Sequence, residues 1–132
     1  MHQKILIIDD EPTLIRILKD RLTKNGYEVS TASDGQEGLD MARSQGPDLI
    51  LLDLMLPKMN GFEVCRILKF DEVYSKIPII LVTARASESD MKTGKEVGAD
   101  AYIVKPIDFN VLMETIKIHL KIEIKLQTEA GR

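Results

Sequence analysis

Five polar side chains follow short apolar segments in this sequence, and together they could bind a cation and a phosphate group. Asp9 and Asp10 follow KILII, Asp53 ends LILLD, Thr83 ends IPIILVT and Lys105 ends AYIVK. Neighbouring carboxylates repel one another and are costly to desolvate, so a site that keeps them usually has a cation to share. Mg²⁺ is typically held by one or two carboxylates together with phosphate oxygens.

Phosphoryl transfer is the reaction that this set of side chains could support. An aspartate beside a bound dication can attack phosphorus and form an acyl phosphate, while a lysine and a hydroxyl neutralise and orient the transferred oxygens. Each residue taken alone has a structural explanation: an Asp after a strand caps a helix, a Thr satisfies a turn and a Lys is solvated. The choice between five separate structural roles and one phosphoryl-transfer site depends on whether the fold brings the five side chains together.

The apolar segments predict five strands. Four are short and nearly continuous, as expected of strands covered on both faces, and one, Tyr27–Ala32, alternates and is expected at an edge of the sheet. The continuous segments are Ile5–Ile8, Leu49–Leu52, Ile79–Val82 and Ala101–Val104.

Helical periodicity fills the intervals between these strands. The residues expected on the buried faces are Ile15, Leu18 and Leu22, then Leu39 and Ala42, then Phe62 to Leu68, and finally Phe109, Leu112, Ile116 and Leu120. Strand and helix alternating five times predict a parallel sheet with helices on both faces. The five polar residues then lie at the carboxyl ends of strands, where ligands bind in open sheets of this kind.

The fourth helical segment, Ser89 to Gly98, has the weakest pattern. It offers only Met91 and Val97 as sizeable apolar residues, and Gly94 in its middle costs about 1 kcal/mol relative to alanine. We expect a loosely held helix, which is the kind of element from which a conformational switch is drawn.

The composition indicates one globular domain. The chain has 132 residues, of which 44% are hydrophobic and 30% charged, and no apolar run approaches the roughly 20 residues of a bilayer span. The net charge of −3 argues against nucleic-acid binding by this domain. The start MHQKILIIDDEP turns acidic too early for a secretory signal. A single cysteine, Cys65, excludes an internal disulfide. We therefore expect a cytoplasmic protein, and we expect Cys65 to lie in the core.

Four sequence segments resemble the receiver domain of two-component response regulators. They are IIDDEP, LLDLMLPKMNGFE, LVTA and YIVKP, and the resemblance extends from about Lys4 to Leu120. It implies a doubly wound, five-stranded parallel α/β sheet of the flavodoxin-like (βα)5 type, with strand order 2-1-3-4-5. We expect residues 1–121 to form the receiver domain and residues 122–132 to form a helix extension or a polar tail.

The resemblance also implies roles for individual residues. Asp53 is the expected phosphoacceptor, and Mg²⁺, for which Mn²⁺ can substitute, is expected on Asp9, Asp10, Asp53 and the backbone carbonyl of Met55. Lys105 contacts the phosphoryl group, Thr83 closes on it, and Tyr102 occupies the aromatic switch position. Pro106 follows a cis peptide bond, and Met55 and Arg85 flank the path of the hydrolytic water and tune dephosphorylation.

The expected function is that of a signalling domain that catalyses only its own phosphorylation and slow dephosphorylation. Its donor would be a histidine kinase or a histidine phosphotransfer protein, and its output would leave through the face made by the fourth helix, the fifth strand and the fifth helix. That face could contact a downstream partner, a missing output domain or a second copy of the chain. Whether the chain is stand-alone or a piece of a longer regulator stays open.

Other classes fit less well. A dehalogenase-type hydrolase needs an acid two residues after the nucleophile, where Met55 stands. A flavin carrier needs a phosphate loop that DDEPT would repel, and a dinucleotide site needs a G-x-G-x-x-G that does not occur. A pseudo-receiver that only binds partners is the remaining alternative, and the intact set of five residues argues against it.

The last helical segment carries more apolar residues than one face can hold. Ile118, Ile122 and Ile124 alternate with polar residues beyond those assigned to packing. We predict that the helix continues past Leu120 and that some of these isoleucines stay exposed as a contact surface; the alternative is an extended tail.

Overall fold

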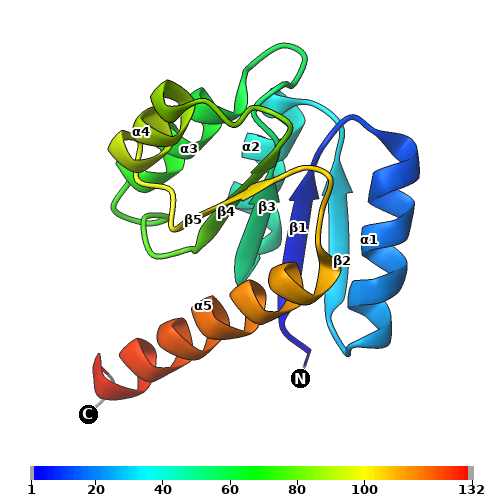
Figure 1. Cartoon of the computed structure of the whole chain (residues 1–132). Helices are drawn as coiled ribbons and strands as arrows, with labels where there is room; N and C mark the ends of the chain where they lie inside the picture. Colours follow the sequence, from blue (N-terminus) through cyan, green and yellow to red (C-terminus); the bar gives the residue numbers. More distant parts are fainter. Residues whose placement is uncertain (1, 131–132) are drawn as a thin grey trace.

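The structure, a computed structural model, describes the backbone of residues 2–130 and the side chains of residues 2–121. In this part of the chain strands and helices alternate (Figure 1). The strands are β1 Lys4–Ile8, β2 Glu28–Ala32, β3 Leu49–Leu52, β4 Ile79–Thr83 and β5 Ala101–Val104. The helices are α1 Pro12–Lys24, α2 Gly35–Gln45, α3 Gly61–Lys69, α4 Glu88–Glu96 and α5 Phe109–Ala130.

The five strands form one sheet in the order β2-β1-β3-β4-β5, and every neighbouring pair is parallel. The predicted fold is therefore confirmed, including the place of β2 at an edge. Because side chains alternate across a strand, β1 sends Leu6 and Ile8 to one face and Ile5 and Ile7 to the other. The first face packs against α2 and α3, and the second packs against α1 and α5.

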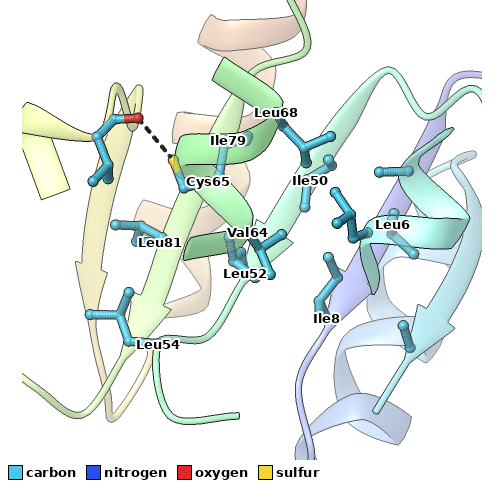
Figure 2. Packing of buried hydrophobic residues seen from close by; sticks show 14 residues of the cluster. Leu6, Ile8, Ile50, Leu52, Leu54, Val64, Cys65, Leu68, Ile79 and Leu81 are labelled. Atoms are coloured by element: carbon cyan, nitrogen blue, oxygen red, sulfur yellow. Dashed lines mark hydrogen bonds between the residues drawn. The ribbon is translucent and has the colours of Figure 1, made fainter. Parts of the chain in front are cut away.

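Helix α3 is held by a dense apolar core (Figure 2). Val64, Cys65 and Leu68 are fully buried against β3 and β4, which contribute Ile50, Leu52, Ile79 and Leu81. The Asn60 side chain accepts a hydrogen bond from the backbone N–H of Glu63 at 3.0 Å and so caps the helix. Burial raises the pKa of the Cys65 thiol to about 12, which agrees with the prediction that Cys65 is a core residue.

Helix α4 has the same length as α3 but buries only Asp90 and Gly94 of its own residues. Met91 is exposed, and Val97, just beyond the helix, supplies the apolar anchor. Packing explains the glycine at position 94, which the sequence alone did not. A Cβ there would lie 3.1 Å from Cδ2 of Tyr102 and 3.2 Å from Cδ1 of Leu81, so the glycine lets the Tyr102 ring approach the helix.

Helix α5 runs past Leu120 to Ala130, as predicted. Leu112, Ile116 and Leu120 are buried against the sheet, whereas Ile118 is 49% exposed. The predicted exposure of Ile122 and Ile124 falls outside the described side chains, and the domain boundary at residue 121 stays a prediction. No helix within residues 2–130 combines the length and apolar character needed to cross a bilayer.

Candidate functional site

The carboxyl ends of β1 and β3 bring three carboxylates together. One oxygen from each of Asp9, Asp10 and Asp53 can be chosen so that all three lie within 4.8 Å of one another. Asp9 and Asp53 are buried, whereas Asp10 is exposed. The parallel pairing of Ile8 with Leu52 fixes this proximity, because each Asp follows directly on those two residues. Hard oxygen ligands of this kind, partly open to water, suit Mg²⁺.

Lys105, which follows β5, places its ammonium among these acids. Its Nζ lies 3.0 Å from Oδ2 of Asp9 and 3.1 Å from Oδ2 of Asp53, and a third acid, Glu11, is 3.4 Å away. The lysine side chain is only 11% exposed, and the peptide bond between Lys105 and Pro106 is cis. The ammonium therefore reaches both buried carboxylates.

Burial and pairing act on the pKa values of this cluster in opposite directions. For Asp9, burial raises the pKa above its ordinary 3.8, although the backbone N–H of Glu11 and the ammonium of Lys105 lower it. For Lys105, burial lowers the pKa, but hydrogen bonds to Asp9 and Asp53 outweigh burial and leave the pKa above 10.5. Lys105 is therefore a fixed positive charge at neutral pH.

Asp10 and Asp53 line a hollow of about 600 Å³ that is open to solvent. Its lining includes Asp10, Glu11, Pro12, Thr13, Asp53, Met55, Ala84 and Lys105. The hollow is wide enough for a small phosphorylated donor, and the Met55 side chain at its edge is 60% exposed.

The loop after β3 holds Asp53 by close backbone packing. A Cβ at Gly61 would lie 2.2 Å from the carbonyl oxygen of Asp53, so only glycine allows α3 to begin against this strand. The backbone N–H of Met55 donates to Oδ1 of Asp53 at 3.3 Å. Asp53 is therefore fixed by its own loop and by Lys105.

Thr83 and Tyr102 both contact the backbone of Arg85. The N–H of Arg85 donates to Oγ1 of the buried Thr83 at 3.4 Å, and the Tyr102 hydroxyl donates to the carbonyl oxygen of Arg85 at 2.7 Å. The Arg85 guanidinium pairs with Asp90 and lies over the Phe62 ring, 5.9 Å from its centroid. The side chain expected beside the path of the hydrolytic water is thus turned toward α4.

The structure brings together Asp9, Asp10, Asp53 and Lys105, with Met55 at the edge of the hollow and Thr83 at the end of the next strand. No role was predicted for two acids: Glu11, which adds to the charge around Lys105, and Asp90, which binds Arg85. The spacing of Ser87 and Asp90 was the available signal for the second. Ser and an acid three residues apart are typical of a helix start.

The family model of the response regulator receiver domain matches residues 5–117. The "Alkaline phosphatase synthesis transcriptional regulatory protein PhoP" of Bacillus subtilis is 42% identical over 121 residues, which cover 92% of this chain and 50% of that protein. The chain spans about half the length of the curated relatives it matches.

Solved receiver structures have the same fold. The crystal structure of a CheY-like response regulator receiver domain protein from Methanospirillum hungatei has a TM-score of 0.89 and 34% identity, covering 95% of this chain and 98% of that one. The BeF3-activated N-terminal receiver domain of RstA from Klebsiella pneumoniae has a TM-score of 0.81 and 30% identity, covering 89% of this chain and 98% of that one.

Proposed function

Because the chain belongs to the response regulator receiver family, we propose that it accepts a phosphoryl group on Asp53 with the help of Mg²⁺. The observation that carries this proposal is the contact of Lys105 with both Asp9 and Asp53 beside an exposed third carboxylate, Asp10. In the proposed reaction a carboxylate oxygen of Asp53 forms a bond to phosphorus while the bond from phosphorus to the donor nitrogen breaks. The donor is the phosphohistidine of a histidine kinase or of a histidine phosphotransfer protein.

Each residue of the cluster has a proposed task. Asp9 and Asp10 would hold Mg²⁺, or Mn²⁺ in its place, with Asp53 and the carbonyl of Met55, and the bound ion would neutralise charge on the transferred oxygens. Lys105 keeps its proton and pairs with a phosphoryl oxygen. The phosphoryl group adds charge and acceptor oxygens near β4, which draw the Thr83 hydroxyl toward Asp53. Tyr102 then adjusts its position behind Thr83.

The proposed output face is formed by α4, β5 and α5. Four apolar side chains on these elements are exposed: Met91 by 42%, Val104 by 38%, Val111 by 52% and Ile118 by 49%. The output face would remove these side chains from water by binding a partner. We propose that it contacts a downstream partner, the remainder of a longer regulator or a second copy of the chain. A pseudo-receiver that only binds partners would leave the buried cluster around Lys105 without a task.

The test of the phosphoacceptor is intact mass after treatment with acetyl phosphate and Mg²⁺. The wild type should gain the mass of one phosphoryl group, and the adduct should be stable in acid and labile in base. Asp53→Asn should gain none, because an amide is a poor nucleophile. Asp40→Asn, which changes an exposed acid on α2, is the matched control and should react as the wild type does. A full mass gain in Asp53→Asn contradicts the assignment.

The metal site is tested by thermal unfolding with and without Mg²⁺. A ligand that binds only the folded state stabilises it by about 2.7 kcal/mol at a hundred times its dissociation constant. Mg²⁺ should therefore raise the melting temperature of the wild type. Asp10→Asn should abolish most of that rise, since it removes the most accessible carboxylate of the three. A rise of equal size in both proteins would place the ion elsewhere.

A further inference from the structure

Asp90 is a buried acid that the proposed reaction does not use. Among the described residues the buried carboxylates are Asp9, Asp53 and Asp90, and the third lies in the first turn of α4, away from the hollow. Its oxygens accept from the Ser87 hydroxyl at 2.7 Å and from the Arg85 guanidinium, while its own N–H donates to Ser87 Oγ at 3.0 Å. The Ser87 hydroxyl, opposed by burial and aided by Arg85, lowers the pKa of Asp90, so it is charged at neutral pH.

Arg85 connects Asp90 with the two expected switch residues, Thr83 and Tyr102. Its N–H reaches the Thr83 hydroxyl, its carbonyl accepts from the Tyr102 hydroxyl, and its side chain binds Asp90. Three elements, β4, β5 and α4, are thus connected at one residue. The Tyr102 ring also packs on Gly94, one turn further along α4.

The other end of α4 is fastened independently. The Cys65 thiol donates to the Val97 carbonyl at 3.6 Å, and Lys69 binds Asp100 at 2.7 Å while also donating to the carbonyls of Ser75 and Ile77. Asp100 in turn accepts from the backbone N–H of Ile79 at 2.8 Å. The carboxyl end of α4 is therefore tied to α3 and β4, and its amino end is tied mainly through Asp90 and Arg85.

We propose that Asp90 is a positioning residue whose pairing with Arg85 carries the rearrangement at Asp53 to α4. The inference rests on the proposed function, because it needs a phosphoryl group to displace Thr83. Movement of Thr83 shifts the N–H of Arg85, and the Arg85 side chain pulls the first turn of α4 through Asp90. The helix then turns about its fixed end at Val97 to Asp100.

The first test is a double-mutant cycle on the free protein. Asp90→Asn keeps the size and the hydrogen bond with Ser87 but removes the charge, and Tyr102→Phe removes the hydroxyl that binds the Arg85 carbonyl. Because both act on the same loop segment, the loss of melting temperature in the double variant should be smaller than the sum of the single losses by about 2 °C or more. Additive losses would overturn the inference. A purely local capping role for Asp90 predicts additivity.

The second test follows amide chemical shifts when Mg²⁺ and beryllofluoride are added. In the wild type the perturbations should include Asp53, Arg85 and residues 88–96; in Asp90→Asn those at Asp53 should remain and those at residues 88–96 should fall by more than half. Glu96→Gln, an exposed acid at the far end of α4, is the control and should respond as the wild type does. If Asp90→Asn shows the full perturbation at residues 88–96, the inference is overturned but the proposed function is not. A wild type without any response at Asp53 contradicts the proposed function and the inference with it.

Discussion

Helices α3 and α4 have equal length, and each follows a strand with a residue of the site at its carboxyl end, yet they are held in different ways. Asn60 caps α3 and Ser87 caps α4, each by accepting a backbone N–H three residues later. Beyond the caps, α3 buries Val64, Cys65 and Leu68 against the sheet, whereas α4 buries a glycine and a charged residue. The helix after Asp53 is thus anchored by apolar packing, and the helix after Thr83 is anchored by polar contacts that can be exchanged.

The difference suits the proposed function. Apolar packing is not easily rearranged, because interiors are dense and a shifted side chain leaves a cavity. Ion pairs and hydrogen bonds near the surface contribute little net stability each, so alternative arrangements cost little. Asp53 therefore lies beside the helix that apolar packing holds, while α4, which polar contacts hold, is the element expected to respond.

The largest expected effect is on stability. Leu68→Ala in α3 should lower the free energy of unfolding by about 2 to 5 kcal/mol, because it removes a fully buried side chain and leaves a cavity. Met91→Ala in α4 should change it by about 0.5 kcal/mol or less, because that side chain is 42% exposed. Urea unfolding followed by circular dichroism measures both. Equal losses would remove the distinction between the helices.

The sequence predicted the fold and the edge of the sheet that carries the site, because both follow from local patterns. Continuous apolar strands such as Leu49–Leu52 and periodic helices such as α5 can be recognised without knowing their neighbours. The predicted convergence of Asp9, Asp53 and Lys105 follows from the parallel order of the strands, and the distances agree with it.

What the sequence could not supply are contacts between residues whose proximity only the fold creates. Gly94 reads as a weak point in a helix, and only the position of Tyr102 shows that a Cβ there would lie in tight contact with the ring, at 3.1 Å. The Arg85 side chain was expected beside the hydrolytic water, and its pairing with Asp90 could not be inferred from a loop without regular periodicity. Glu11 directly follows Asp10 in the sequence, but its approach to Lys105 joins residues that are far apart along the chain.

A smaller effect is expected from the loop that precedes α3. Met55, before α3, is apolar and cannot orient a water molecule, so the phosphorylated wild type should lose its phosphoryl group slowly. Met55→Asn should speed the loss by about fivefold, the kinetic equivalent of one hydrogen bond of about 1 kcal/mol. Phosphate release after removal of the donor measures the rate. Met91→Asn makes the same change on α4 and should have no effect; an unchanged or slower rate in Met55→Asn would refute the role of residue 55.

The different responses of α3 and α4 are measured most directly by amide hydrogen exchange with and without Mg²⁺ and beryllofluoride, followed for both helices in the same sample. Exchange in α4, residues 88–96, should change by at least about fivefold, which is the lower end of usual allosteric coupling. Exchange in α3, residues 61–69, should stay the same. A change of equal size in both helices, or a change confined to α3, would contradict the proposal that α4 is the element that responds.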